Sequence, residues 1–92
     1  MSDIENVSFT MRGFREYSEW QTEDRRILSK INKLINDIVR NGYDGIGHPE
    51  PLKDNLQGWW GREIDKKNRL VYRMLDDNKV EIMQCKGHYS DT

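Results

Sequence analysis

The sequence predicts a small α+β domain in the order β-α-α-β-β-β, with two helices packed on an antiparallel sheet. Three observations lead to this fold class. Apolar residues recur at helical spacing over residues 27–39, three runs with strand-like alternation follow residue 58, and short polar turns separate those runs. Strands that follow helices along a chain, rather than alternating with them, are typical of α+β domains.

The first two predicted elements are a strand and a helix. Residues 6–11 have the β-branched and aromatic content of a short strand. Phe14, Tyr17 and Trp20 then recur at every third position, which predicts a short helix with an aromatic face.

A second helix is predicted to begin at Thr22, whose hydroxyl would cap it, with Glu23 and Asp24 near the positive end of the helix dipole. Asn41-Gly42 supplies the left-handed residue at which such a helix ends. The apolar residues between these limits fall on one face, which we expect to face the core: Ile27, Ile31, Leu34, Ile35, Ile38 and Val39.

The next stretch, residues 42–51, holds three Gly and two Pro. That composition excludes a helix or a central strand, so we predict a loop, which the two prolines stiffen. Loops of this length inside a compact domain are usually functional or disordered.

Three strands are predicted after the loop, at residues 59–64, 69–75 and 79–85, with residues 86–89 continuing the last. The polar turns at 65–68 and 76–78 are short, so the three strands should form an antiparallel meander.

The composition limits the class of protein. A chain of 92 residues makes one domain, which we assign to residues 1–92 with short flexible ends at about 1–5 and 90–92. The single Cys85 excludes an internal disulfide framework and fits a reducing compartment. No apolar run approaches the ~20 residues that span a membrane, and no signal peptide opens the sequence, so we expect a cytoplasmic protein without a membrane partner.

The charge is unevenly distributed along the chain. The net charge is −1, but residues 1–24 carry two basic and six acidic side chains, and residues 25–92 carry thirteen basic and ten acidic ones. Nucleic-acid affinity depends on local clusters of Lys and Arg rather than on the total. The balance therefore permits RNA binding without arguing for it.

Glu50 is the first candidate for chemistry, because it lies between Pro49 and Pro51. An acid with little backbone freedom suits a residue that must be aimed at a substrate. The alternative is a loop acid that is merely solvated.

Arg69 and His88 are the next candidates. Arg69 opens one predicted strand and His88 lies near the end of the following one, so an antiparallel pairing would bring both to one end of the sheet. By alternation, His88 should point to the same side as Lys86. A lone strand Arg and a lone His are each more often structural or merely exposed.

Further side chains could line a site or could equally be structural. The basic residues that could contact phosphates, or form a solvated strand face, are Lys53, Arg62, Arg73 and Lys86. The aromatic residues that could stack on bases, or pack in the core, are Trp59, Trp60 and Tyr72. Cys85 and His88 have a metal-like spacing, but two ligands do not make a site, so neither a metal nor another cofactor is expected.

An acid and a His with a cation between them are what in-line cleavage of RNA needs. One group takes the proton from a ribose 2′-OH and the other protonates the leaving 5′-oxygen. The cation offsets the charge that builds on the phosphoryl oxygens.

Several strings together resemble the YoeB toxin family within the RelE-like mRNA interferases. They are Gly47-His-Pro-Glu-Pro-Leu-Lys53, Trp60-Gly-Arg-Glu-Ile64, Arg69-Leu-Val-Tyr72 and His88-Tyr89, with Trp20-Gln and Ile31-Asn-Lys-Leu-Ile-Asn-Asp37 upstream. The resemblance covers roughly residues 6–89, with the motifs in the family's order and near its spacing.

The resemblance implies a RelE-like fold and a ribosome-dependent endoribonuclease toxin. Such an enzyme cuts mRNA in the ribosomal decoding site by metal-independent attack of the substrate's own 2′-OH. Its implied partners are a YefM-like antitoxin, the ribosome with its mRNA, and a second copy in a homodimer. The residue roles implied are Glu50 as general base, His88 as general acid, Arg69 as transition-state clamp, and Lys53, Arg62 and Tyr89 as RNA or phosphate contacts.

The chain departs from the family pattern at three places. Arg62-Glu63 stands where the family usually has two basic residues, and His48 stands where it typically has Lys. The chain also continues past Tyr89 with Ser90-Asp-Thr92. Two alternatives therefore stay open, a non-enzymatic RelE-fold toxin of the ParE type that inhibits gyrase, and a degenerate homologue that only binds antitoxin.

Overall fold

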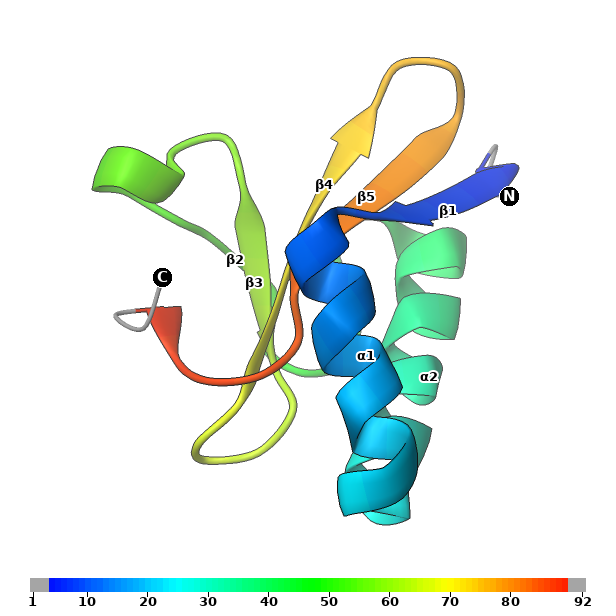
Figure 1. Ribbon diagram of the computed structural model, residues 1–92. Coiled ribbons are helices and arrows are strands. Elements are labelled where there is room, and N and C mark those ends of the chain that lie inside the picture. The colour runs from blue at the N-terminus through cyan, green and yellow to red at the C-terminus, as the bar shows by residue number, and fades with distance from the viewer. Residues whose placement is uncertain (1–3, 90–92) are drawn as a thin grey trace.

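The computed structural model describes residues 4–89, which form two helices packed on a five-stranded sheet (Figure 1). The helices, α1 (Met11–Glu23) and α2 (Arg25–Asn41), lie side by side. The strands are β1 (Asn6–Phe9), β2 (Glu50–Pro51), β3 (Trp60–Glu63), β4 (Arg69–Leu75) and β5 (Lys79–Gln84), and a short 3-10 turn, η1 (Asp54–Leu56), follows β2. The predicted α+β class and the order of its main elements are confirmed.

The sheet differs from the predicted one in two respects. Its order is β1-β5-β4-β3-β2, and β1 runs parallel to β5 while the other pairs are antiparallel. The sheet is therefore mixed, because alternation along β1 predicts a strand but not its partner. The predicted loop also contains the two-residue strand β2, whose Pro51 is tolerated because β2 is an edge strand.

Helix α1 begins after Thr10, whose hydroxyl accepts a hydrogen bond from the Gly13 N–H at 3.1 Å. Gly13 faces β5 so closely that a Cβ there would overlap the carbonyl oxygen of Ile82. The buried positions of the helix are Gly13, Glu16 and Trp20. The predicted aromatic face is therefore wrong at Phe14, which is 56% exposed.

Helix α2 begins at Arg25 rather than Thr22, which lies inside α1. Asp24 caps it, because its carboxylate accepts hydrogen bonds from the N–H groups of Arg26 and Ile27. The predicted end is confirmed at Gly42, which has a φ of 66° and donates its N–H to the carbonyl of Ile38.

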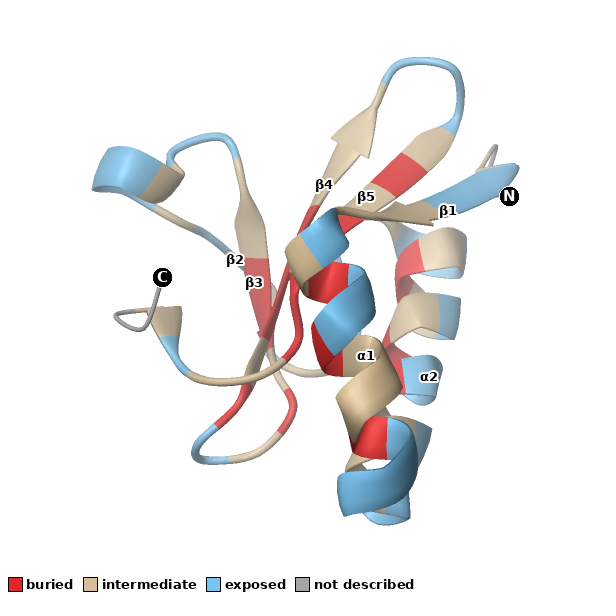
Figure 2. Ribbon diagram, viewed as in Figure 1, coloured by how far each residue is buried: buried red, intermediate tan, exposed pale blue. Residues whose placement is uncertain are grey.

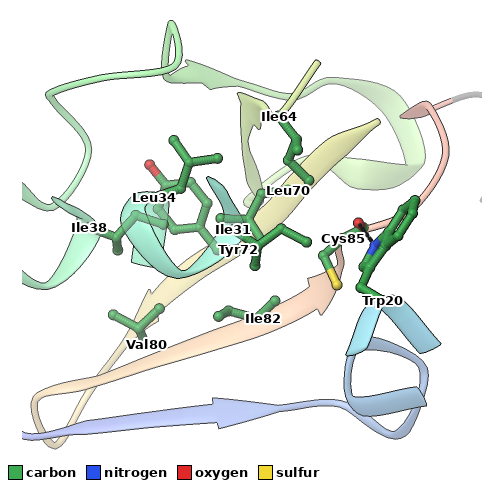
Figure 3. Close-up of a cluster of buried hydrophobic side chains, with 10 residues drawn as sticks. All are labelled: Trp20, Ile31, Leu34, Ile38, Ile64, Leu70, Tyr72, Val80, Ile82 and Cys85. Carbon is green, nitrogen blue, oxygen red and sulfur yellow. Dashed lines mark hydrogen bonds between the residues drawn. The ribbon is translucent and has the colours of Figure 1, made fainter. Parts of the chain in front are cut away.

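The core lies between the helices and the sheet. Figure 3 shows core side chains that come from the helices and from the sheet. In Figure 2 the buried residues, in red, lie on parts of both helices and on the central strands. Full burial of each large aliphatic side chain contributes about 1.5–3 kcal/mol. The cluster consists of Trp20, Ile31, Leu34, Ile38, Ile64, Leu70, Tyr72, Val80, Ile82 and Cys85.

Arg62 is wholly buried at the margin of this core. Its Nε donates to the Tyr72 hydroxyl at 3.0 Å, and Nη1 donates to the Asp37 carboxylate. The remaining donors reach backbone carbonyls of the glycine-rich loop, at Gly42, Asp44 and Ile46. The predicted phosphate contact of Arg62 is therefore wrong, because its guanidinium is saturated on the helix side of the sheet and does not reach solvent.

Asp37 is the charged partner of this buried guanidinium. Burial alone would raise the pKa of Asp37, but hydrogen bonds from Arg62, the Ile46 N–H and Asn41 outweigh it, so the pKa lies below its ordinary value. Asp37 consequently stays ionised, and its stabilising effect is present above the pKa of the unfolded chain and is lost as the pH falls through the lower folded pKa.

The two ends of the chain were expected to be flexible. Residues 1–3 and 90–92 lie outside the described residues. Ile4 packs against the core, and the Glu5 N–H donates to the Asn78 carbonyl at 2.8 Å. Within residues 4–89, neither helix is long and apolar enough to span a membrane.

Replacing Arg62 with Met should lower the free energy of unfolding by about 3–5 kcal/mol, because it leaves a carboxylate and several carbonyls without their buried partner. Arg73→Met is the matched control on the same sheet. Arg73 pairs with Glu81 at a partly exposed site, where we expect a loss of no more than about 1 kcal/mol. Urea denaturation of both variants measures the difference, and equal losses would contradict the structural role of Arg62.

Candidate active site

The face of the sheet opposite α2 carries charged residues at one end. The strand register places Glu50 opposite Gly61 in β2 and β3, and Glu63 opposite Arg69 in β3 and β4. Because side chains alternate along a strand, Gly61 and Glu63 face away from the side on which Arg62 meets α2. Glu50, Glu63 and Arg69 thus share the outer face.

The chain beyond β5 turns back past β4 toward β2 and β3 (Figure 1). We call residues 85–89 the C-terminal strap. Its first residue, Cys85, is tied to α1, because its N–H donates to the Glu16 carboxylate at 2.8 Å and its carbonyl accepts from Trp20 Nε1 at 2.9 Å. Figure 3 shows the hydrogen bond between Trp20 Nε1 and the Cys85 carbonyl.

The middle of the strap is bound to the start of β4. The Gly87 N–H donates to the Asn68 side-chain oxygen, and the Gly87 carbonyl accepts from the Arg69 N–H, both at 2.9 Å. The Gln84 amide donates to the carbonyls of Gly87 and His88 at 3.2 and 3.1 Å. Gly87 has a φ of 85°, a conformation that favours glycine. These bonds fix the backbone from which the exposed His88 projects.

The alternation that predicts His88 on the same side as Lys86 does not hold, because both residues lie in the strap. Strand β5 ends at Gln84, so His88 does not continue its alternation and need not point to the side of Lys86. Lys86 instead meets α1, where its ammonium lies 3.1 Å from the Glu19 carboxylate and 2.7 Å from that of Glu23. Hydrogen bonding to Glu23 raises the pKa of Lys86, which is therefore engaged in a structural ion-pair cluster rather than in lining a site.

Tyr89 packs on the outer face directly over Gly61. A Cβ on Gly61 would overlap the Tyr89 hydroxyl and ring, so the close approach depends on glycine. Burial raises the pKa of Tyr89, and the charge of Glu50 and its hydrogen bond with the phenol raise it further, to about 12. The phenol is thus a proton donor to the Glu50 carboxylate, while Arg69 acts in the opposite direction on the pKa of Tyr89.

The His88 and Arg69 side chains complete the cluster. The His88 ring lies beside that of Tyr89, with 5.0 Å between centroids. The Arg69 Nη1 donates to the carbonyls of Asp65 and Asn68 at 2.5 and 3.1 Å, which holds the guanidinium against the β3–β4 turn. Its Nη2 lies 4.0 Å from the Glu63 carboxylate.

The structure therefore brings together Glu50, Arg69, His88 and Tyr89, four of the six residues to which the family resemblance gives a role. Arg62 is buried on the other side, as described above. Lys53 is exposed between β2 and η1. No group of three or more His, Cys, Asp or Glu residues suited to a metal ion occurs within residues 4–89.

Several positioning residues were missed by sequence reasoning. A glycine inside a predicted strand signals the close approach of another part of the chain, and Gly61 is such a case. Asn68 and Gln84 carry no comparable signal, because their partners in the strap are backbone atoms. Among the predicted base-stacking residues, Tyr72 is wholly buried, while Trp60 stacks on Tyr43.

Comparisons with known proteins agree on one family. A family model, "YoeB-like toxin of bacterial type II toxin-antitoxin system", matches residues 9–89. Toxin YoeB of Streptomyces coelicolor is 46% identical over 83 residues, which are 90% of this chain and 98% of that protein.

Solved structures give the same result. The YoeB/ParE toxin from Agrobacterium tumefaciens matches with a TM-score of 0.89 and 37% identity, covering 92% of this chain and 100% of its own. YoeB of Staphylococcus aureus, solved as a dimer and in a heterotetrameric complex with YefM, matches with a TM-score of 0.83 and 45% identity, covering 91% of this chain and 97% of its own. The expected RelE-like fold is thereby confirmed.

The link between Tyr89 and Glu50 is testable without substrate. We expect the Tyr89 phenol to titrate near pH 12, and Glu50→Gln to lower its pKa toward the ordinary value of 10 because it removes the carboxylate charge. The titration of Tyr89 is measured as the phenolate absorbance of each protein minus that of its Tyr89→Phe counterpart. Asp76→Asn, in the distant β4–β5 turn, is the charge-matched control.

The raised pKa of Tyr89 also makes the free energy of unfolding depend on pH. Because the folded pKa is raised, the contribution of Tyr89 is present below pH 10 and is lost as the pH rises toward 12, and Tyr89→Phe should lack this loss. A phenol that titrates at its ordinary pKa in the wild type would show that Tyr89 is not held against Glu50.

Proposed function

The chain belongs to the YoeB-like toxins of bacterial type II toxin–antitoxin systems, and on that premise we propose that it is a ribosome-dependent endoribonuclease that cuts mRNA in the decoding site. The observation that carries the proposal is the convergence of Glu50, Arg69, His88 and Tyr89 at one open end of the sheet. An acid, a cation and an imidazole at one exposed place are the groups that RNA cleavage requires.

In the proposed reaction the nucleophile is the ribose 2′-OH of the substrate. Glu50 accepts its proton as the oxygen attacks the adjacent phosphorus, and His88 donates a proton to the departing 5′-oxygen. The products are a 2′,3′-cyclic phosphate and a free 5′-hydroxyl. Glu50 lies in β2, paired to β3, and accepts a hydrogen bond from Tyr89, which supports its role as an aimed base.

Arg69 would offset the negative charge that grows on the phosphoryl oxygens. Its guanidinium is held by two carbonyls and is 16% exposed, so it can meet a phosphate without first being ordered. Lys53 would contact the RNA backbone from the neighbouring loop, and Tyr89 would help to place the nucleotide. With cationic Arg69 in the cluster, the reaction is proposed to need no metal.

The proposal extends to partners and setting. The similar toxin of Staphylococcus aureus forms a dimer and a complex with YefM, which supports a YefM-like antitoxin and a homodimer here. A ribosome-dependent toxin acts where translation occurs, so we place the protein in the cytoplasm. The continuous core supports treating residues 1–92 as one domain. A gyrase inhibitor of the ParE type, or a homologue that only binds antitoxin, would have no use for a clustered acid, Arg and His.

Replacing His88 with Asn should reduce cleavage by about 10²–10⁴-fold, because it removes the proton donor of the leaving group. Primer extension on a translated message measures the cuts, and growth arrest on expression should disappear in parallel. His48→Asn is the matched control, since His48 has a φ of 53°, which Asn tolerates, and is given no role in the proposed reaction. Undiminished toxicity of the His88 variant would favour the gyrase-type alternative.

A second experiment tests the origin of the nucleophile. A message with a single 2′-deoxy nucleotide on the 5′ side of the cut should resist cleavage at that position, because it lacks the attacking hydroxyl. The all-ribose message, translated in the same mixture, is the control and should end in a cyclic phosphate. Equal cutting of both messages would rule out internal attack.

A further inference from the structure

Glu63 is a second carboxylate, besides Glu50, near Arg69, and it has no role in the proposed reaction. It lies directly opposite Arg69 in the register of β3 and β4. Its carboxylate is 4.0 Å from Arg69 Nη2, an ion pair without the short contact of a hydrogen bond, and its side chain is 45% exposed. A side chain held this loosely can turn away into solvent.

The other side of the guanidinium is already occupied. Arg69 Nη1 donates to the carbonyls of Asp65 and Asn68, so the group keeps its position whether or not Glu63 is near. A phosphate that approached the Nη2 side, which faces Glu63, would compete with the Glu63 carboxylate for the same donor.

We propose that Glu63 occupies Arg69 in the RNA-free protein and is displaced by an RNA phosphate, so that Glu63 sets the affinity of the site for its substrate. This inference rests on the proposed function, because it takes RNA as the ligand of Arg69. Glu63 acts on the entry of the phosphate and transfers no proton, so it sets affinity rather than the rate of the chemical step.

The charges near Arg69 support the competition. The formal charges of Glu50, Glu63 and Arg69 sum to −1, and Glu63→Gln would bring that sum to 0. The influence of Glu63 reaches the Tyr89 phenol, whose pKa it helps to raise after burial and Glu50. Both carboxylates thus act on the space that a phosphate would enter. Exposure and salt weaken such effects, so the change in affinity should be modest.

The test compares Glu63→Gln with Asp76→Asn, which makes the same charge change in the exposed β4–β5 turn. Inorganic phosphate is the first probe, titrated while the Arg69 Nε–H signal is followed by NMR. We expect Glu63→Gln to bind phosphate about two- to fivefold more tightly than the wild type, with the gain shrinking as salt is added. Asp76→Asn should bind as the wild type does.

Cleavage kinetics with mRNA-loaded ribosomes are the second readout. Glu63→Gln should lower KM about two- to fivefold and leave kcat nearly unchanged, because only the entry of the phosphate is altered. Unchanged phosphate affinity in Glu63→Gln, an equal gain in Asp76→Asn, or a fall in kcat would overturn the proposal. If no variant and no wild type cleaves RNA, the proposed function fails, while the phosphate titration still decides the role of Glu63. Urea denaturation confirms that each variant is folded.

Discussion

The buried guanidinium of Arg62 fixes the part of the molecule from which the site is built. Its donors hold three carbonyls of the glycine-rich loop and the carboxylate of Asp37 on α2, so the loop, the helix and β3 meet at one point. The loop then reaches Gly47, whose carbonyl accepts from the Glu63 N–H at 2.7 Å, and three residues later Glu50 enters the sheet. The place of Glu50 thus depends on a cation that never meets the substrate.

Neighbouring charges on β3 have opposite surroundings. Arg62 points to the helices and is saturated by the protein, while Glu63 points to the outer face and remains partly exposed. The pleat of the strand separates them, so a change at one has little direct effect on the surroundings of the other. The strand therefore carries a structural charge on one face and a charge that faces the site on the other.

Sequence reasoning reached the main elements because their signals are local. The apolar face of α2, its end at Gly42 and the three later strands follow from periodicity and turn residues within short windows. The partner of β1 and the strap's anchorage on Glu16 and Trp20 depend on contacts between distant parts of the chain, which periodicity does not report.

The candidate site follows the same rule: residues marked by local sequence signals were predicted, and those placed by long-range contacts were not. The strand ends and the family motif indicated Glu50, Arg69 and His88, whereas the packing of Tyr89 over Gly61 is a long-range contact whose partner no local pattern reports. The prediction for Arg62 is wrong for an instructive reason. Arg62 alternates in step with Trp60 and Ile64, a pattern that indicates a side chain facing the core. Its basic character and the family resemblance instead led to the prediction of a phosphate contact.

The first residue of the strap gives the molecule a chemical reporter. Cys85 is the only cysteine of the chain, is wholly buried, and has a thiol pKa that burial, and then the nearby Glu16, raise to about 12. Alkylating reagents attack the thiolate, so a buried thiol with this raised pKa reacts slowly in the folded protein. Cys85 is also held to α1 through Glu16 and Trp20, so its rate of alkylation reports on openings that break these contacts or unfold the chain.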